Sequence, residues 1–330
     1  MKILAFGEAM LRFTVPEAML LEQSDTVRLS TVGTGVNLLA SLAHMGYQTE
    51  LLTCLPDNAV GRKMAADIRK MGIMDQQIIY TGQHIGSFFV ELGYGSRPER
   101  VIYQDRLASA FCTTPVERYS FEIGLSSVDI VHICGITLSL SENTRQAAFK
   151  LAKLAHGAGK LVCFDFNYRV ELNRGNSHEQ MKRYYQTMLE SADVVFGSLR
   201  DLTDLLDYQG ESEAAIMAKF VADYQLKFFA GSKRSYQNGQ KSFSGFCFTA
   251  GGLHESAARP LQILDRIGSG DAFASGIITG IIEQWSLNEM LDFAVANSVL
   301  AQSAMNDSAL FTKADVHAYL ESDGMNELLR

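Results

Sequence analysis

Long apolar runs and paired cysteines are both missing from this chain. No run of about 18 apolar residues occurs, so no segment is expected to span a membrane, and residues 1–8 are too briefly apolar for a signal peptide. No two cysteines form a CxxC pair; the five are Cys54, Cys112, Cys134, Cys163 and Cys247. Three of them lie in strand-like apolar runs, where a reduced cysteine behaves as a small hydrophobe, which predicts a cytoplasmic protein.

The chain has a modest share of charged residues and a negative net charge. Charged residues make up 20% of the 330 residues, hydrophobic residues make up 47%, and there is no low-complexity tract. The composition therefore predicts a large buried core without long disordered segments. The formal net charge of -8 disfavours nucleic acid and anionic membranes as partners. The net charge does not exclude a polyanionic cofactor, because backbone N–H groups at its site and a bound metal can offset the negative field of the protein.

Common nucleotide and metal signatures are also missing. The sequence has no GxxxxGK[ST] motif, which argues against a P-loop enzyme. Gly33-Thr34-Gly35 opens a helical pattern, but Leu38 stands where a dinucleotide fingerprint needs its third glycine, so a nicotinamide dehydrogenase is a remote alternative. The seven histidines are dispersed and HExxH is absent, so no metal ligand is assigned.

Short apolar runs alternate with amphipathic stretches along most of the chain. Strands are expected at residues 3–6, 50–54, 130–134, 161–166, 194–196 and 228–230, and helices at residues 37–45, 61–71, 143–158, 179–190, 271–284, 287–305 and 313–320. This alternation predicts an α/β fold with a mostly parallel central sheet and helices on both faces.

Two segments break the alternation. Residues of about 10–34 and 84–112 read as extended and lack a helix, so they are expected to form a small antiparallel β lid over a site on the main sheet. The whole chain, residues 1–330, is expected to be one domain. An apolar lid face and open edge strands also predict a homodimer formed through the lid.

The most informative segment is DRIGSGDAFASG, residues 265–276. Gly268, Ser269 and Gly270 can bring backbone N–H groups together at a helix N-terminus, where an anion is stabilised. Asp271 would repel that anion unless it accepts a proton from a hydroxyl during phosphoryl transfer. The alternative is an aspartate that merely stabilises the first helical turn.

Five patches in this order resemble the ribokinase-like (PfkB-family) sugar kinases, and within them the 2-keto-3-deoxygluconate kinases. The patches are Gly7-Glu8-Ala9-Met10-Leu11-Arg12, Gly33-Thr34-Gly35-Val36-Asn37, the segment from Arg97 to Ala110, Phe164-Asp165-Phe166-Asn167-Tyr168-Arg169, and Asp265 to Asp271. The resemblance implies an ATP- and Mg²⁺-dependent kinase that phosphorylates a terminal hydroxyl, with a monovalent cation left open. A fructokinase, another ketose or riboside kinase, or a non-catalytic sugar or nucleotide sensor are the alternatives.

The resemblance also implies roles for particular residues. Asp271 would be the base and the turn at Gly268, Ser269 and Gly270 the anion hole. Substrate contacts are expected from Glu8, Gly33, Thr34, Asn37, Tyr103, Arg106, Asn167 and Arg169, and nucleotide contacts from Ser198, Asp201, Gly268, Gly270 and Asn297. An arginine such as Arg169 or Arg106 can clamp a carboxylate, which suits an acid sugar. Three of these residues have a structural alternative: Asn37 could cap a helix, Arg169 could form a surface ion pair, and Asn297 could serve helix packing.

Several positions depart from the family pattern. Val32 replaces the first glycine of the sugar signature, and Ser198 and Asp201 stand where an Asn-x-x-Glu element is usual, which predicts altered metal handling. Residues 231–244 match the usual nucleotide-side strand poorly, so a weakened or retuned enzyme is also expected as an alternative.

Overall fold

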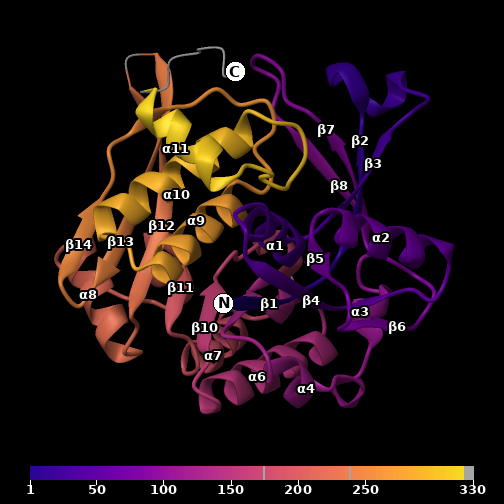
Figure 1. Ribbon diagram of the computed structural model, residues 1–330, viewed down its shortest axis with the longest axis horizontal. Coiled ribbons are helices and arrows are strands. Elements are labelled where there is room, and N and C mark those ends of the chain that lie inside the picture. The colour runs from indigo at the N-terminus through magenta and orange to yellow at the C-terminus, as the bar shows by residue number, and fades with distance from the viewer. Residues whose placement is uncertain (174, 238, 323–330) are drawn as a thin grey trace.

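The computed structural model describes residues 1–173, 175–237 and 239–322. The main sheet contains β1 (Lys2–Phe6), β4 (Gln48–Leu55), β5 (Ile73–Met74), β6 (Ile78–Tyr80), β9 (Ile130–Cys134), β10 (Leu161–Asp165), β11 (Val194–Phe196), β12 (Phe228–Gln237), β13 (Gln240–Thr249), β14 (Gly252–Glu255) and β15 (Arg259–Pro260). Its strand order is β14-β13-β12-β11-β10-β9-β1-β4-β5, with β6 paired to β4 and β15 to β13 (Figure 1). The strands from β12 to β5 run parallel, whereas β13 to β15 add antiparallel pairs.

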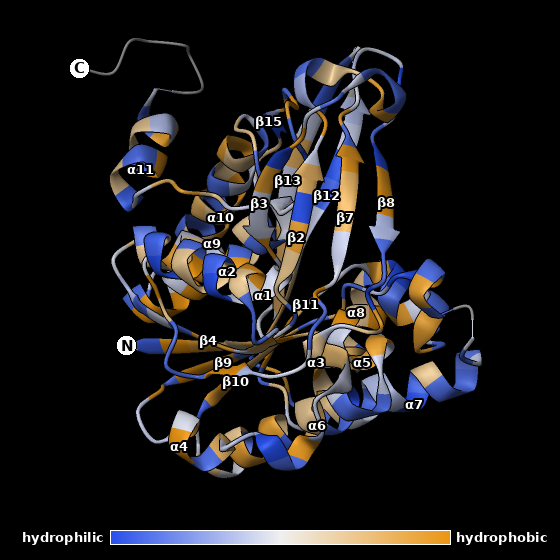
Figure 2. Ribbon diagram, turned by 90° about the vertical axis from the view of Figure 1, so that its right-hand side faces the viewer, coloured by the Kyte–Doolittle hydropathy of each residue, from blue (hydrophilic) through white to orange (hydrophobic). Residues whose placement is uncertain are grey.

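Helices cover both faces of this sheet (Figure 2). One face carries α1 (Thr34–His44), α2 (Ala59–Lys70), α9 (Ser269–Glu283) and α10 (Leu287–Gln302), with α11 (Lys313–Glu321) packed outside α10. The other face carries α3 (Ala110–Thr113), α4 (Phe121–Leu125), α5 (Ile136–Leu140), α6 (Glu142–Gly157), α7 (His178–Leu189) and α8 (Glu213–Asp223). Short helical turns lie at η1 (Pro16–Ala18), η2 (Leu21–Gln23), η3 (Val116–Arg118), η4 (Val170–Asn173) and η5 (Asp201–Leu205). The predicted α/β architecture is confirmed.

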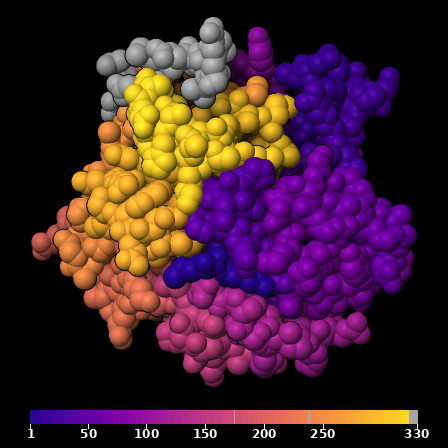
Figure 3. Space-filling model, in the orientation of Figure 1, coloured from indigo at the N-terminus to yellow at the C-terminus, as the bar shows by residue number. Residues whose placement is uncertain are grey.

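Successive side chains of a strand point to opposite faces of the sheet, so one strand can contribute to two hydrophobic clusters, one on each face. In β1, Leu4 and Phe6 join the cluster under α6 and α7, whereas Ile3 and Ala5 join the cluster under α1 and α9. Segments far apart in sequence meet in the second cluster. At the surface, the orange-to-yellow C-terminal segments lie against the purple N-terminal part of the chain (Figure 3). Among the described residues, no helix combines the length and apolar character needed to cross a bilayer.

Most expected elements are found, with shifted ends. The helix expected from residue 37 begins at Thr34, and the helix expected to reach residue 305 ends at Gln302. The strand expected at residues 228–230 extends to Gln237 and forms a hairpin with β13, and the α8 helix was not expected. The single domain expected over residues 1–330 includes residues 323–330, which lie outside the described residues.

The expected lid is a separate sheet of β2 (Met10–Thr14), β3 (Arg28–Val32), β7 (Ser87–Glu91) and β8 (Arg100–Gln104), in the order β3-β2-β7-β8. Its outer pairs are antiparallel, but the central pair β2–β7 is parallel. Strand β2 follows β1 in the chain, and β7 follows β6. Because β1 and β6 run in the same direction in the main sheet, β2 and β7 enter the lid in the same direction and pair in parallel.

A buried arginine ties the lid to the main sheet's helices. Arg12 of β2 is fully buried; its Nη2 donates to Asp265 Oδ2 at 2.5 Å, its Nη1 to Asp307, and its Nε to Thr14 Oγ1 at 2.8 Å. Asp265 precedes α9 and Asp307 follows α10. All sides of the guanidinium are therefore used, which the planar fork of arginine allows and lysine does not. Burial raises the pKa of Asp307 to about 6, although Arg12 opposes the shift.

This network predicts a pH-dependent cost for Arg12→Met. The variant leaves Asp265 and Asp307 buried without their cation, so we expect a loss of roughly 3–5 kcal/mol in the free energy of unfolding near neutral pH. The pKa of Asp307 should rise further without Arg12, and a carboxyl with a raised folded pKa lowers stability as pH rises through that pKa. Chemical denaturation should therefore show a smaller deficit at about pH 5 than at about pH 8.

Lys63→Met is the matched control. Lys63 pairs with Asp67 one helical turn away on the surface of α2, and both side chains are about one-third exposed. Its loss should cost less than about 1 kcal/mol, without the pH trend. Equal costs for the two variants at every pH would contradict the assigned role of Arg12.

Candidate active site

A cleft of about 1270 Å³ lies between the lid and the carboxyl ends of the parallel strands. Ligands of open α/β sheets bind at this edge. Every residue expected to act in catalysis or binding lines the cleft except Asn297: Glu8, Gly33, Thr34, Asn37, Tyr103, Arg106, Asn167, Arg169, Ser198, Asp201, Gly268, Ser269, Gly270 and Asp271. The structure thus brings together residues from both ends of the chain.

The glycine turn before α9 is fixed by a close backbone approach. Gly268 has φ 82°, in the left-handed region, and a Cβ there would lie 1.8 Å from the carbonyl oxygen of Asp307. Only glycine fits this position. The N–H groups of Gly270 and Asp271 are in the first helical turn, where no intrahelical acceptor exists, and both residues line the cleft. The turn can therefore bind an anion.

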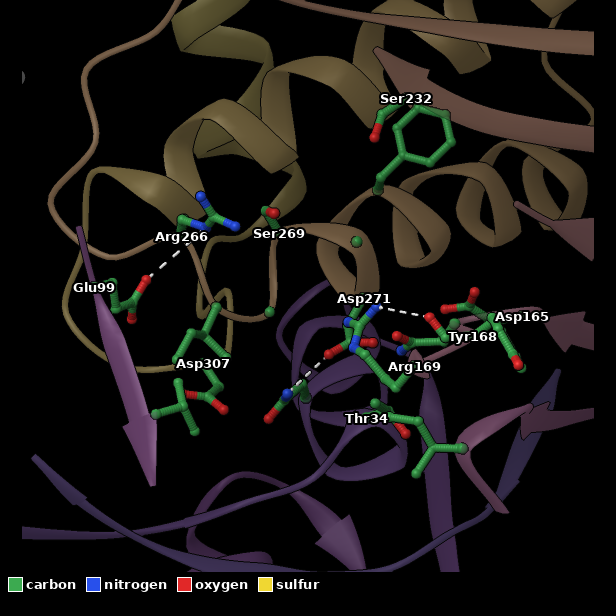
Figure 4. A pocket seen from close by; sticks show the side chains of 18 of the residues that line it. Thr34, Glu99, Asp165, Tyr168, Arg169, Ser232, Arg266, Ser269, Asp271 and Asp307 are labelled. Atoms are coloured by element: carbon green, nitrogen blue, oxygen red, sulfur yellow. Dashed lines mark hydrogen bonds and ion pairs between the residues drawn. The ribbon is translucent and has the colours of Figure 1, made fainter. Parts of the chain in front are cut away.

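Asp271 lies beside this turn, at the floor of the cleft (Figure 4). Its side chain is buried, and Asn37 Nδ2 donates to its Oδ2 at 2.8 Å. Burial raises the pKa of Asp271 well above its usual value, and the carboxylates of Asp165 and Asp307 add to the rise. A carboxylate with a raised pKa is a stronger base than an ordinary aspartate.

Asn37 is more than a helix cap. It lies one turn inside α1, and its Oδ1 accepts from Gly33 N and from Ser308 Oγ, both at 3.4 Å. The same side chain donates to Asp271. Asn37 therefore orients the carboxylate that faces the cleft.

A second polar group lies at the lid end of the cleft. Arg106 Nε donates to Glu8 Oε2 at 2.7 Å, and Ser109 Oγ donates to Glu8 Oε1 at 3.2 Å. Burial raises the pKa of Glu8, and Arg106 opposes the shift. Arg106 Nη1 is buried and has no hydrogen-bond partner among the described residues. Tyr103 is half exposed, with its ring centroid 5.2 Å from the Arg106 guanidinium carbon. This end can donate to a polar ligand.

A third group follows strand β10. Asp165 ends the strand, and burial raises its pKa to about 7 while Arg169 opposes the rise. Asn167 has φ 39°, and its buried Oδ1 lacks a partner among the described residues. Arg169 is exposed to the cleft and forms no ion pair within the described part of the chain. Its Nη1 donates to the Tyr168 carbonyl at 3.5 Å, so the other guanidinium nitrogens are available to a ligand. The surface ion pair considered for Arg169 is not found among the described residues.

The element that departs from the family pattern is also in the cleft. Asp201 begins η5, and its Oδ2 accepts from Ser198 N at 2.7 Å and Ser198 Oγ at 2.8 Å. Burial raises the pKa of Asp201. Within the described ranges, no group of three potential ligands could hold a metal by itself. Asp165 and Asp201 fit a Mg²⁺ ion that takes most of its ligands from phosphate and water oxygens.

Asn297 does not line the cleft. It is fully buried in α10, where its Nδ2 donates to the Ala272 carbonyl at 2.8 Å and to Ser275 Oγ at 3.1 Å. The small residues around it serve the packing of α10 on α9, so helix packing is the role that the structure gives it. Its Oδ1 is buried without a hydrogen-bond partner among the described residues, and the expected nucleotide contact stays a prediction.

Sequence patterns gave no role to several residues of the site. Asp165, Arg234 and Asp307 line the cleft, and Arg12 holds Asp307 in place. Arg12 carried a signal, since an arginine inside an otherwise apolar alternation is expected to have a buried partner. The partners themselves come from loops about 250 to 300 residues away, which no local pattern connects.

Comparison with known proteins agrees with this geometry. The model of the pfkB family carbohydrate kinases matches residues 1–312. The structure of a candidate 2-keto-3-deoxygluconate kinase from Enterococcus faecalis is 47% identical, with a TM-score of 0.97, over 100% of this chain and 99% of that one. A 2-dehydro-3-deoxygluconokinase from Thermotoga maritima is 28% identical, with a TM-score of 0.91, over 97% and 99%.

A curated relative covers a similar span. A 2-dehydro-3-deoxygalactonokinase from Haloferax volcanii is 24% identical over 319 residues, which are 97% of this chain and 96% of the relative. The family model alone covers more than nine-tenths of the chain, and the cleft holds the residues that the motifs predicted. The chain belongs to the pfkB family of carbohydrate kinases.

Proposed function

We propose that this sugar kinase transfers the γ-phosphoryl group of ATP to the terminal hydroxyl of 2-keto-3-deoxygluconate. The observation that carries the proposal is the buried Asp271 beside the Gly268 turn, a base next to an anion site within one cleft. Residues 1–330 and the two lid segments would act as one catalytic unit, because both sheets line that cleft.

The transfer follows from this arrangement. An Asp271 oxygen takes the proton of the hydroxyl while the hydroxyl oxygen attacks the γ-phosphorus, the bond to the β-phosphate breaks, and ADP leaves. N–H groups of the turn at Gly268 stabilise the charge that develops on the phosphoryl oxygens. A Mg²⁺ ion near Asp165 and Asp201 would neutralise phosphate charge. The lid excludes water, which would otherwise accept the phosphoryl group.

The choice of an acid sugar rests on two of the arginines that line the cleft, Arg106 and Arg169. Arg106 Nη1 is buried without a hydrogen-bond partner among the described residues. Arg169 forms no direct ion pair there, although its charge opposes the rise in the pKa of Asp165 and Asp201. A carboxylate is the anion that an arginine binds with two parallel hydrogen bonds. A neutral ketose such as fructose is the alternative substrate, and it would leave Arg169 unused.

Asp271→Asn tests the proposed base. The change keeps size and polarity but removes proton acceptance, so turnover of 2-keto-3-deoxygluconate should fall at least about 100-fold, while ATP affinity changes little or improves. ADP release measured with a coupled assay gives the turnover, and calorimetry gives the affinity. Near-normal turnover would remove Asp271 from the mechanism, and a wild-type protein that binds sugar and ATP without turnover would support a sensor.

Arg169→Ala tests the proposed substrate. The loss should raise the KM for 2-keto-3-deoxygluconate by an amount worth roughly 2–5 kcal/mol, because a carboxylate covered by the lid loses its cation. Fructose has no carboxylate and should be affected much less. The ratio of kcat/KM for the acid over the neutral sugar is measured in both proteins.

Arg183→Ala is the control for that ratio, since Arg183 lies on the exposed surface of α7 beside Glu179. An acid-to-neutral ratio that stays constant in Arg169→Ala would reject the carboxylate clamp.

We further propose that the protein is a homodimer formed through the lid. The strand register aligns four apolar residues across the lid: Leu29, Phe13, Phe89 and Ile102. The Phe13 and Phe89 rings stack with centroids 5.0 Å apart, and Leu29 is 44% exposed. A contiguous apolar row of this kind is an expected protein interface.

Light scattering at micromolar concentration should give the mass of a dimer. Phe89→Glu places a charge in the proposed interface and should give monomers, whereas Ile123→Glu changes an exposed residue of α4 and should leave the dimer intact. A wild-type monomer, or a dimer that persists in Phe89→Glu, would contradict the lid interface.

A further inference from the structure

The strand that matches the family pattern poorly contributes an arginine to the cleft wall. In β12, Ser232 and Arg234 line the cleft, whereas the intervening Lys233 does not. Lys233 forms ion pairs with Glu213 at 3.5 Å and Glu255 at 3.1 Å. The alternation of side chains along a strand therefore separates a surface cation from a cation of the cleft.

Arg234 reaches the anion-binding turn. Its Nη2 donates to Ser269 Oγ at 2.8 Å and to Gln302 Oε1 at 3.3 Å, and its guanidinium carbon lies 5.5 Å from the Phe243 ring centroid. Ser269 is the first residue of α9, between the two glycines of the turn. These contacts hold the guanidinium next to the N–H groups that are available to an anion.

No carboxylate neutralises this arginine within the described part of the chain. Its hydrogen-bond acceptors are a hydroxyl and an amide, and it forms no ion pair there. Partial desolvation lowers the pKa of Arg234, and the positive charge of Arg266 adds to the shift. Arg266 also lines the cleft, and the carboxylate paired with it, Glu99, is 3.9 Å away. Arg234 is thus the cation without an ion pair beside Arg266 and the helix N-terminus, and an anion bound next to it would offset the repulsion between the two arginines.

We propose that Arg234 binds the terminal phosphates of the phosphoryl donor. Its guanidinium, positioned by Ser269 and Gln302, donates to non-bridging oxygens of a polyphosphate chain. This inference rests on the proposed ATP-dependent transfer and names a residue for it on the nucleotide side of the turn. The fork geometry of the guanidinium suits phosphate, and Nη2 is the one nitrogen of Arg234 with a hydrogen-bond partner within the described part of the chain.

An arginine that only fastens β12 to α9 would behave differently. A fastening role predicts lower stability for any variant, with nucleotide affinity unchanged after correction for folding. A phosphate-binding role predicts a loss that depends on how many phosphates the ligand carries. The Arg234 side chain is largely exposed to the cleft, so Arg234→Gln is expected to fold.

Calorimetry with AMP, ADP and a non-hydrolysable ATP analogue separates these roles. Arg234→Gln should weaken binding of the analogue and of ADP by about tenfold or more, and leave AMP binding unchanged, because only the longer ligands carry terminal phosphates. Arg234→Lys should recover part of the loss by keeping the charge without the fork. Lys233→Gln is the matched control on the same strand and should bind all three ligands as the wild-type protein does.

The outcomes distinguish this inference from the proposed function. Equal affinity of wild-type protein and Arg234→Gln for the ATP analogue would overturn the role of Arg234 while leaving ATP-dependent transfer in place. An equal loss for AMP and the analogue would also overturn that role, because these ligands share only the nucleoside and the α-phosphate. A wild-type protein that binds none of the three nucleotides would overturn both proposals.

Discussion

The site depends on the contact between the Gly268 backbone and the Asp307 carbonyl. A Cβ at residue 268 would lie 1.8 Å from that oxygen, so the turn can take this shape only with glycine. Arg12 holds Asp307 from the lid side and Asp265 from the approach to the turn. The anion-binding turn, the loop after α10 and the first lid strand are therefore one connected unit. Movement of the lid is expected to be transmitted to the turn through this unit.

The carboxylates buried around the turn at Gly268 lower the stability of the fold when they are ionised. Burial raises the pKa of Asp271, Asp307 and Asp165, and only Asp307 has a buried arginine as direct partner. Each raised pKa lowers stability as pH rises through it, so the site is maintained at the expense of the fold. The same shift makes Asp271 a better proton acceptor.

The sequence predicted the parallel sheet and the lid, because glycine turns, apolar periodicity and motif order can be read from the chain itself. All but one of the residues that it assigned to the site line the cleft. It failed where partners are distant. The Arg12 network joins residues about 250 to 300 positions apart, and the parallel β2–β7 pair depends on the direction in which two strands leave the main sheet. Asn297 shows a different limit, since small residues suit both adenine binding and helix packing, and only the tertiary structure shows that this amide donates to a carbonyl of α9. The extension of β12 was missed because Lys233 and Arg234 interrupt its apolar pattern.

The most direct test of the account is the identity of the reaction product. Wild-type protein is incubated with ATP, Mg²⁺ and 2-keto-3-deoxygluconate, and the mixture is followed by phosphorus NMR with proton coupling. The account predicts one new phosphomonoester whose phosphorus couples to the two protons of a terminal methylene, formed in step with ADP. ADP formation without an ester, an ester on a secondary carbon, or no reaction with this sugar acid while fructose is phosphorylated would contradict it.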